Sequence, residues 1–251
     1  MIHLDAGLIG LLVGSGFIAS CINAVAGGGS LVSFPALLLA GYPALVANVT
    51  NTVAQVPGYL SGAGVSRALL EDQRARIRRI APVAIAGSVC GAFLLTRTPS
   101  GAFRAAVPWL VLASAAMLAA QPRLARRLSA GERRAKPSPL LLVSQFAAAV
   151  YGGFFGAGLG VVLLASLALF LSDSLHRLNA LKQFLSLLIN LVAALWFVAF
   201  ANVAWAAAAP MAAGCLAGGV AGGVLARRIA PSLLRTLVVA LGVAVAVRLL
   251  I

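Results

Sequence analysis

The chain has 251 residues, of which 62% are hydrophobic and 10% are charged. Soluble globular proteins have about 45–50% apolar and about 25% charged residues. These proportions, with a mean hydropathy of +1.04, exclude a soluble domain, a disordered chain and a disulfide-rich scaffold. A chain this apolar is expected to be dissolved in a bilayer.

The formal net charge is +14, from 19 Lys and Arg residues against five Asp and Glu residues. Eleven of the basic residues lie in two short polar stretches, residues 67–79 and 122–136, each between long apolar runs. Cytoplasmic loops of membrane proteins carry such an excess of Lys and Arg. We therefore expect residues 67–79 and 121–137 to be cytoplasmic loops. The same distribution argues against nucleic acid as a partner, because most of the basic residues lie in short stretches between long apolar runs.

Ten apolar runs follow one another along the chain. They cover residues 8–25, 30–40, 44–66, 80–96 and 103–120 in the first half, and residues 140–155, 160–171, 178–200, 203–226 and 233–251 in the second. A spanning helix needs about 20 apolar residues, so the second run of each half is too short to span comfortably. The N-terminus lacks the basic stretch of a signal peptide, so the first run is expected to stay as a membrane helix. The sequence predicts an all-α polytopic membrane protein.

Landmarks recur in the same order in the two halves, offset by about 130 residues. A glycine-rich segment precedes each short run, at residues 27–29 and 156–160. An Asn-containing segment opens each following run, at residues 47–51 and 178–182, and a Pro-Ser pair opens the last run of each half. Three landmarks in order indicate a duplicated unit of five segments.

We therefore expect two transmembrane repeats, residues 1–120 and 140–251, joined by a basic cytoplasmic linker, residues 121–139. Five crossings in each repeat would give the two repeats opposite orientations, an architecture that recurs among transporters. This count places Arg227 and Arg228 in the cytoplasm and both termini in the periplasm. Arg97 and Arg104 argue against this count, because it places both of them on the periplasmic side of the membrane.

The short runs and their glycines are the first candidates for a site. A pair of short, glycine-interrupted segments at matching places in two halves is the best sequence pointer to a transport site. Each short helix must begin or end inside the membrane, and its N-terminus offers unpaired N–H groups and partial positive charge to an anion. The alternative is that glycines only allow close helix packing. That alternative fits Gly87 and Gly91, and Gly214, Gly218 and Gly222, where small residues recur every four positions.

Polar residues at the start of the third and eighth runs are the second candidates, because polar groups inside a membrane are costly. Lys182 is the only lysine outside the linker. It is either the counter-charge for a bound anion or a side chain that reaches back to the headgroups. The expected substrate site comprises Gly27, Gly28, Gly29, Ser30, Asn48, Thr50, Asn51, Gln55, Gly156, Gly158, Gly160, Asn179, Lys182 and Gln183.

Four further polar residues have simpler interpretations. Asn23 and Asn190 lie inside apolar runs and are expected to hydrogen-bond between helices. Asp173 and His176 follow the second short run; capping of a loop is favoured over a role in proton coupling.

Missing residues exclude several functions. No Asp or Glu falls within an apolar run, although a cation carrier or proton pump usually needs a buried carboxylate. No P-loop and no HExxH motif occurs, and two histidines with five acids assemble no catalytic set. The three cysteines all lie in apolar runs without a CxxC pair, so metal or disulfide chemistry is not expected. We expect no enzyme activity and no cofactor.

The glycine and asparagine segments resemble those of the sulfite exporter TauE/SafE family, also called the 4-toluene sulfonate uptake family. The resemblance runs from about residue 8 to the C-terminus, and is carried by residues 23–30, 34–37, 47–51, 151–160 and 176–182. The two halves differ within it: Asn51 stands where the second half has Lys182, and Pro35 has no partner in the second short run.

The resemblance implies a permease of the bacterial inner membrane for a sulfur-containing anion, such as sulfite or sulfoacetate. We expect the anion to lie between the two short helices and rocking of one repeat against the other to switch its exposure. A passive anion channel, a permease for an unrelated small anion and a membrane assembly factor are the alternatives. Membrane lipid is the other expected partner. The coupling ion, a proton or sodium, the oligomeric state, the exact substrate and the direction of transport are left open.

Overall fold

The computed structural model describes residues 5–25, 27–129, 139–225 and 231–250, with side chains undescribed at 122–129, 225 and 231–234. The described residues form helices and no strands. The first half contains α1 (Ala6–Val25), α2 (Ser30–Leu39), α3 (Ala44–Val65), the 3-10 helix η1 (Arg67–Gln73), α4 (Arg74–Arg97) and α5 (Ser100–Ser129). The second contains α6 (Pro139–Phe154), α7 (Leu159–Phe170), α8 (Leu175–Phe200), α9 (Trp205–Leu225) and α10 (Pro231–Leu250).

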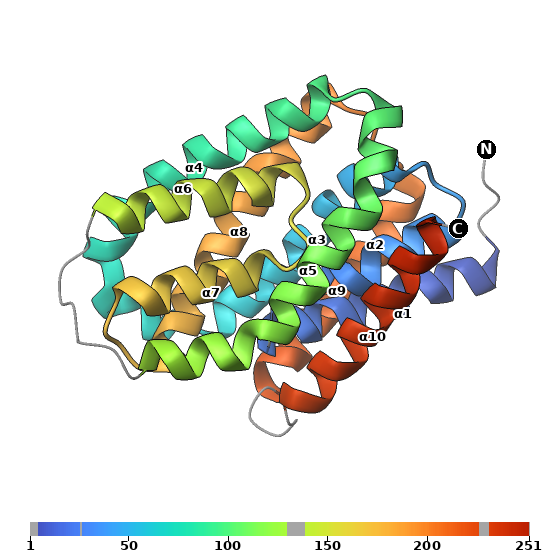
Figure 1. Cartoon of the computed structure of the whole chain (residues 1–251). Coiled ribbons are helices and arrows are strands. Elements are labelled where there is room, and N and C mark those ends of the chain that lie inside the picture. Colours follow the sequence, from blue (N-terminus) through green and yellow to red (C-terminus); the bar gives the residue numbers. More distant parts are fainter. Residues whose placement is uncertain (1–4, 26, 130–138, 226–230, 251) are drawn as a thin grey trace.

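Each of the ten apolar runs is one α-helix, as predicted (Figure 1). The stretch 67–79 is not the expected loop: η1 and the first turns of α4 occupy it. Helix α4 takes in the basic residues before its apolar run, because arginine has good helix propensity and neither glycine nor proline occurs in residues 67–81. Pro82 lies inside the helix. Helix α5 likewise continues into the expected linker as far as Ser129. The rest of that linker, residues 130–138, lies outside the described residues, as do Arg227 and Arg228.

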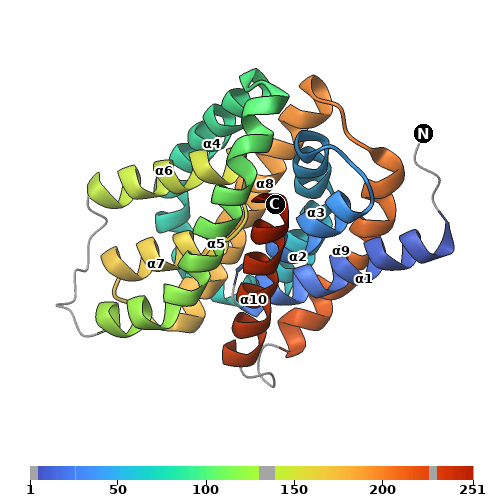
Figure 2. The same cartoon turned by 45° about the vertical axis from the view of Figure 1, so that its right-hand side comes forward.

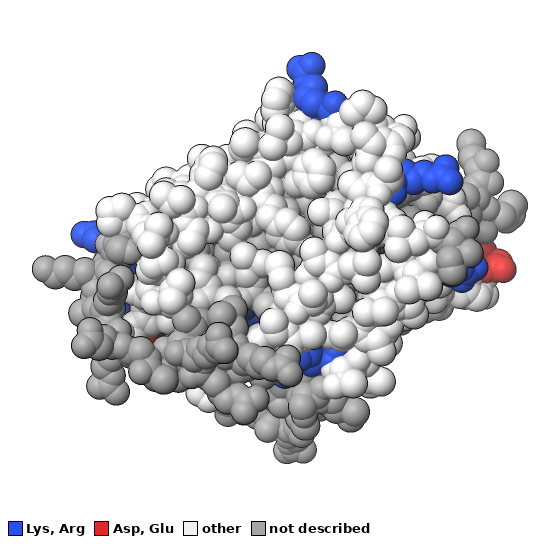
Figure 3. Space-filling view, in the orientation of Figure 1, with Lys and Arg blue, Asp and Glu red and all other residues white. Residues whose placement is uncertain are grey.

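Five segments of the described chain are long and apolar enough to cross a membrane. They are Ala6–Val25, Arg67–Arg97, Ser100–Gln121, Leu175–Phe200 and Trp205–Val224. The short second run of each half is a short helix, α2 with 10 residues and α7 with 12. At 1.5 Å per residue these helices rise about 15–18 Å, against a hydrocarbon thickness of about 30 Å. A broad stretch of the face in Figure 3 carries no charged side chain, which fits a surface exposed to lipid.

Helices from the two halves of the chain pack against each other, so the halves do not form two separate units. Helix α1 packs along α9 and helix α4 along α6, while α3 contacts both α9 and α8 (Figures 1 and 2). These pairings recur when each helix is exchanged for its counterpart in the other half: α1 on α9 becomes α6 on α4, and α3 on α9 becomes α8 on α4. Contacts of α3 with α8 and of α5 with α10 join counterparts.

Glycines let α1 approach α9 closely, and α4 approach α6. Close packing was predicted for these segments because small residues recur in them every four positions. A Cβ at Gly214 would lie 2.0 Å from the Val13 carbonyl oxygen, and one at Gly218 would lie 2.1 Å from that of Phe17. On the other pair, a Cβ at Gly91 would lie 2.0 Å from the Val150 carbonyl oxygen. Real Cβ atoms do not come this close, so these pairs require glycine.

Candidate functional site

The two glycine segments meet each other. A Cβ at Gly27 would lie 2.7 Å from the Cα of Gly160, and a Cβ at Gly160 would lie 2.6 Å from the Cα of Gly27. Gly27, Gly156 and Gly158 have φ values of 87°, 74° and 73°, which favour glycine. The starts of α2 and α7 are therefore brought together, from opposite halves of the chain.

Several N–H groups at these helix starts already have partners. Gly29 N–H donates to Asn23 Oδ1 at 2.8 Å. The N–H groups of Leu31 and Val32 donate to carbonyls at residues 28 and 29, and those of Leu159 and Val161 donate to carbonyls at 156 and 158. Some of the backbone N–H groups expected to bind an anion are thus already hydrogen-bonded within their own turns. Side chains therefore become the stronger candidates for binding it.

One buried network joins three helices of the first half. Gln55 Nε2 donates to Ser30 Oγ at 2.8 Å, to Ser33 Oγ at 2.9 Å and to Asn51 Oδ1 at 3.0 Å. Asn23 Nδ2 donates to Gln55 Oε1 at 2.7 Å, which confirms the expected bond between helices. Ser33 Oγ also donates to Asn51 Oδ1 at 2.6 Å. The amide of Gln55 is thus fully occupied, which gives it a structural role in this conformation.

Lys182 is fully buried on α8, so the side chain does not reach back to the membrane surface. Its Nζ donates to the backbone carbonyl of Asn23 at 3.1 Å. An ammonium can donate three hydrogen bonds. The ion pairs of the described residues involve Arg76, Arg177, Asp72 and Asp173, so no carboxylate of this part of the chain offsets the charge of Lys182.

Neighbours of Lys182 on the same face of α8 carry oxygen atoms that lack hydrogen-bond partners. On this face of α8, three buried oxygen atoms have no hydrogen bond: Asn179 Oδ1, Gln183 Oε1 and Ser186 Oγ. These positions fall at helical spacing around Lys182, so they form one stripe. Buried polar groups are normally paired, and an unpaired group calls for a ligand or a water molecule. We call Asn179, Lys182, Gln183 and Ser186 the α8 stripe.

Two asparagines tie the halves together in corresponding ways. Asn48 Nδ2 on α3 donates to the carbonyl of Phe154, the last residue of α6, at 3.0 Å. Asn179 Nδ2 on α8 donates at 3.4 Å to the carbonyl of Ala24, near the end of α1. In both cases the amide oxygen is buried and unpaired. Asn48 and Asn179 thus occupy equivalent places in the two halves.

Thr50 lies apart from these groups. It is buried, but its hydroxyl accepts a hydrogen bond from the N–H of Ala204 at 3.0 Å, before α9. Gly28 faces the side chain of Leu118, 2.8 Å from an added Cβ. Asn190 was expected to bond another helix; its Nδ2 instead donates to the Ser186 carbonyl, one turn earlier on α8.

The turn between α7 and α8 carries an ion-pair cluster. Asp173 pairs with Arg76 of α4 and with Arg177, and Arg177 also pairs with Asp72. Burial of Asp173 opposes its ionisation, but hydrogen bonds from Arg76, from the Ser174 N–H and from Arg177 outweigh it and hold the pKa below its ordinary value. His176 is exposed. Asp173 therefore closes the turn, as expected for a loop residue, and also ties it to α4.

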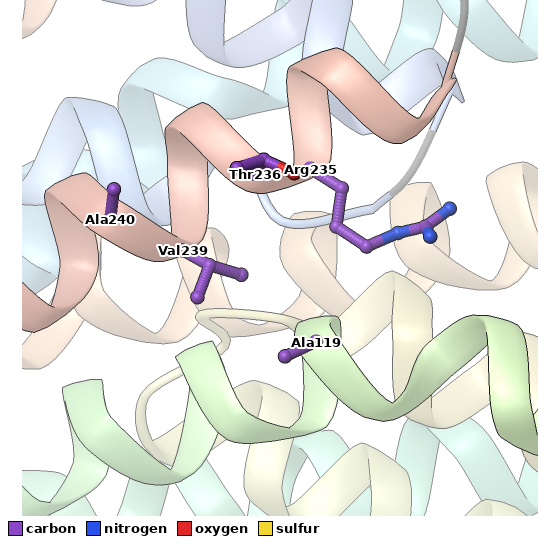
Figure 4. Close-up of a pocket in the computed structure, with 5 residues that line it drawn as sticks. All are labelled: Ala119, Arg235, Thr236, Val239 and Ala240. Carbon is purple, nitrogen blue, oxygen red and sulfur yellow. The ribbon is translucent and has the colours of Figure 1, made fainter.

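A cavity of about 360 Å³ lies between α5 and α10 (Figure 4). Ala119, Arg235, Thr236, Val239 and Ala240 line it, and none belongs to the α8 stripe or to the network around Gln55. Among the described residues no cluster of His, Cys, Asp or Glu could hold a metal ion.

We call the network around Gln55 and the α8 stripe together the polar centre. The sequence did not single out two of its members as site residues, and it predicted only a bond between helices for a third. Ser33 and Ser186 looked like ordinary serines in apolar runs, and Asn23 was expected to make only an interhelical bond. The signal was spacing: Ser33 lies one turn after Ser30, and Ser186 one turn after Lys182 and Gln183.

The sequence profile described as sulfite exporter TauE/SafE matches residues 12–249. A probable membrane transporter protein of Haemophilus influenzae is 31% identical over 213 residues, covering 82% of this chain and 80% of that protein. Probable membrane transporter protein ORF9 of Sinorhizobium sp is 26% identical, over 79% of this chain and 75% of its own. Probable membrane transporter protein YfcA of Escherichia coli K12 is 27% identical, over 82% and 76%. No solved structure matches the chain. With nearly its whole length matched, the chain belongs to the sulfite exporter TauE/SafE family and is a membrane transporter.

Proposed function

We propose that this transporter moves a small sulfur-containing anion, sulfite or an organosulfonate, across the bacterial inner membrane by alternating access. The observation that carries the proposal is Lys182, which is fully buried with one backbone carbonyl as its hydrogen-bond acceptor. The family to which the chain belongs supports the substrate class.

The charge of Lys182 needs an explanation because burying an ammonium without a counter-ion is costly. Other buried polar groups of the centre, such as Gln55 and Asn51, are neutral and bonded to one another. An anion that enters beside Lys182 would supply the missing counter-charge and occupy its spare donor positions. Charge-assisted hydrogen bonds of this kind are about twice as strong as neutral ones.

The packing favours moving bodies that combine both halves of the chain. The close contacts of α1 with α9 and of α4 with α6 resist separation, since glycines bring their backbones together. One body would contain α1, α3 and α9, and the other α4, α6 and α8. The contacts between the bodies include α3 with α8, where Gly62 of α3 approaches the side chain of Gln183. We propose that these mixed bundles, rather than the two sequence repeats, rock against each other.

Counterflow in proteoliposomes tests the proposal. Vesicles preloaded with unlabelled sulfite should accumulate labelled sulfite transiently, and unlabelled sulfonates should compete while chloride should not. A saturable carrier gives this overshoot, whereas a channel gives simple equilibration. Sulfite flux without counterflow would reject alternating access, and no sulfite or sulfonate flux would reject the substrate class.

A further inference from the structure

The α8 stripe combines a donor charge with acceptor oxygens. Lys182 offers two N–H donors beyond its bond to Asn23. One turn before it, Asn179 presents a buried oxygen with no partner. Gln183 and Ser186 continue the stripe, each 3% exposed or less and each with an unpaired oxygen. A simple oxyanion has only acceptors, so it would satisfy Lys182 and leave the oxygen of Asn179 unpaired.

The orientation of the Asn179 amide is fixed by its neighbour. An amide can be turned so that its oxygen and nitrogen exchange places. The Nδ2 of Asn179 faces the carbonyl oxygen of Ala24 at 3.4 Å, and a carbonyl can only accept. Turning the amide would set two oxygens against each other, so the unpaired atom is the oxygen. Asn48, which is 1% exposed, is fixed in the same way by the carbonyl of Phe154.

We infer that the ligand of the α8 stripe is a sulfur monoanion that carries a hydrogen-bond donor of its own. Lys182 would bind the anionic oxygens, and Asn179 Oδ1 would accept from a hydroxyl on the ligand. Hydrogen sulfite and hydroxyalkyl sulfonates have this chemistry, whereas sulfate, the sulfite dianion and simple alkanesulfonates do not. The inference rests on the proposed function and narrows its substrate class.

The charge count of the site agrees with one negative charge. Lys182 is the charged member of the buried centre. The described arginines that form ion pairs, Arg76 of α4 and Arg177 of α8, form them with Asp173 at the α7–α8 turn and with Asp72. A dianion would bring a second charge into a buried centre without a partner for it. With hydrogen sulfite the proton would cross on the substrate itself, so transport linked to protons would not require a buried carboxylate.

Two sulfonates of similar shape test the inference. 2-Hydroxyethanesulfonate and propane-1-sulfonate carry the same charge and differ by a hydroxyl in place of a methyl group. Binding to the purified protein is measured by calorimetry for the wild type and Asn179→Ala. Asn190→Ala is the matched control, because Asn190 is a buried asparagine on α8 whose Nδ2 bonds the backbone of its own helix.

The wild type should bind the hydroxysulfonate about three- to tenfold more tightly, the effect of one additional hydrogen bond. Asn179→Ala should bring the two affinities together, and Asn190→Ala should keep the wild-type ratio. Equal binding of both sulfonates by the wild type would overturn the inference and leave the proposed function standing. A preference that survives in Asn179→Ala would also overturn it. If neither sulfonate nor sulfite binds, the proposed function fails and the inference with it.

Discussion

Replacing Gly27 with alanine tests whether the backbones of the two glycine segments must touch. Gly27 has a φ of +87°, and an added Cβ would lie 2.7 Å from Gly160 Cα and 2.8 Å from Gly160 C. A left-handed conformation costs an alanine about 1–2 kcal/mol. Forcing an extra methyl group into a packed interior costs about 1–3 kcal/mol more. Gly27→Ala should therefore lower the free energy of unfolding by about 2–5 kcal/mol.

Thermal unfolding of the purified protein in one detergent measures this loss. For soluble domains of this size, about 1 kcal/mol corresponds to about 2–4 °C in Tm, which sets the expected scale. Gly160→Ala should cost less than Gly27→Ala, because the φ of Gly160 is not positive and only the contact with Gly27 is strained.

Gly10→Ala is the matched control for this experiment. Gly10 lies in α1 with nothing within 4 Å of an added Cβ. Alanine is favoured over glycine inside a helix by about 0.5–1 kcal/mol. This variant should be as stable as the wild type or slightly more stable. If Gly27→Ala unfolds at the same temperature as Gly10→Ala, the two glycine segments are not in contact, and the starts of α2 and α7 do not meet as described.

Three further substitutions probe other parts of the structure. Asn23→Ala leaves Gln55 Oε1 and Gly29 N–H unpaired, so it should lower the unfolding free energy by about 1–3 kcal/mol for each group; an unchanged Tm would contradict the network. Asp173→Asn removes a carboxylate whose pKa is lowered on folding, so the stabilisation is present above the ordinary pKa and is lost as pH falls through the folded value. Its Tm deficit relative to wild type should thus be constant near neutral pH and vanish in acid; a deficit that grows in acid would refute the ion pairs. Gly218→Ala should cost about 1–3 kcal/mol by pushing α9 away from α1, and wild-type stability would contradict that close packing.

Helix positions were predictable because long apolar runs in a membrane protein leave no other structure for the backbone. The two short helices also followed from run length, at residues 30–40 and 160–171. The sequence did not predict that η1 and α4 would extend through the basic stretch 67–79, because a helix that leaves the hydrocarbon continues as long as its residues favour it.

Which helix faces which polar residue could not be predicted. Thr50 and Asn51 are neighbours on α3, yet successive helical residues point about 100° apart. Asn51 therefore meets Ser33 on α2, whereas Thr50 meets the backbone before α9. Burial of the Lys182 side chain could not be predicted either, because a lysine near the start of a helix can reach the membrane surface or be buried. The decisive feature is the end of α1, whose Asn23 carbonyl covers the ammonium.

The packing of the two halves was the other unpredictable feature. A duplicated sequence gives equal units, but does not say whether each unit packs on itself. Here α1 packs on α9 and α4 packs on α6. Both contacts are made through glycines and join helices that are far apart in the sequence. Small-residue stripes at Gly87 and Gly214 indicated close packing without naming the partner.

The most direct measurement is the melting temperature of wild type and Lys182→Met, each with and without sulfite. If Lys182 is a buried cation waiting for an anion, Lys182→Met should be at least as stable as the wild type without ligand, because an apolar side chain of similar volume removes an unpaired buried charge. The variant should also lose the stabilisation by sulfite, which for a ligand at 100 times its Kd is about 2.7 kcal/mol. Gln145→Met is the control: Gln145 is fully buried and donates to Ser166 at 2.6 Å, so its loss should lower stability and leave the response to sulfite intact. A Lys182→Met protein that is less stable without ligand yet is stabilised by sulfite as strongly as the wild type would contradict the account.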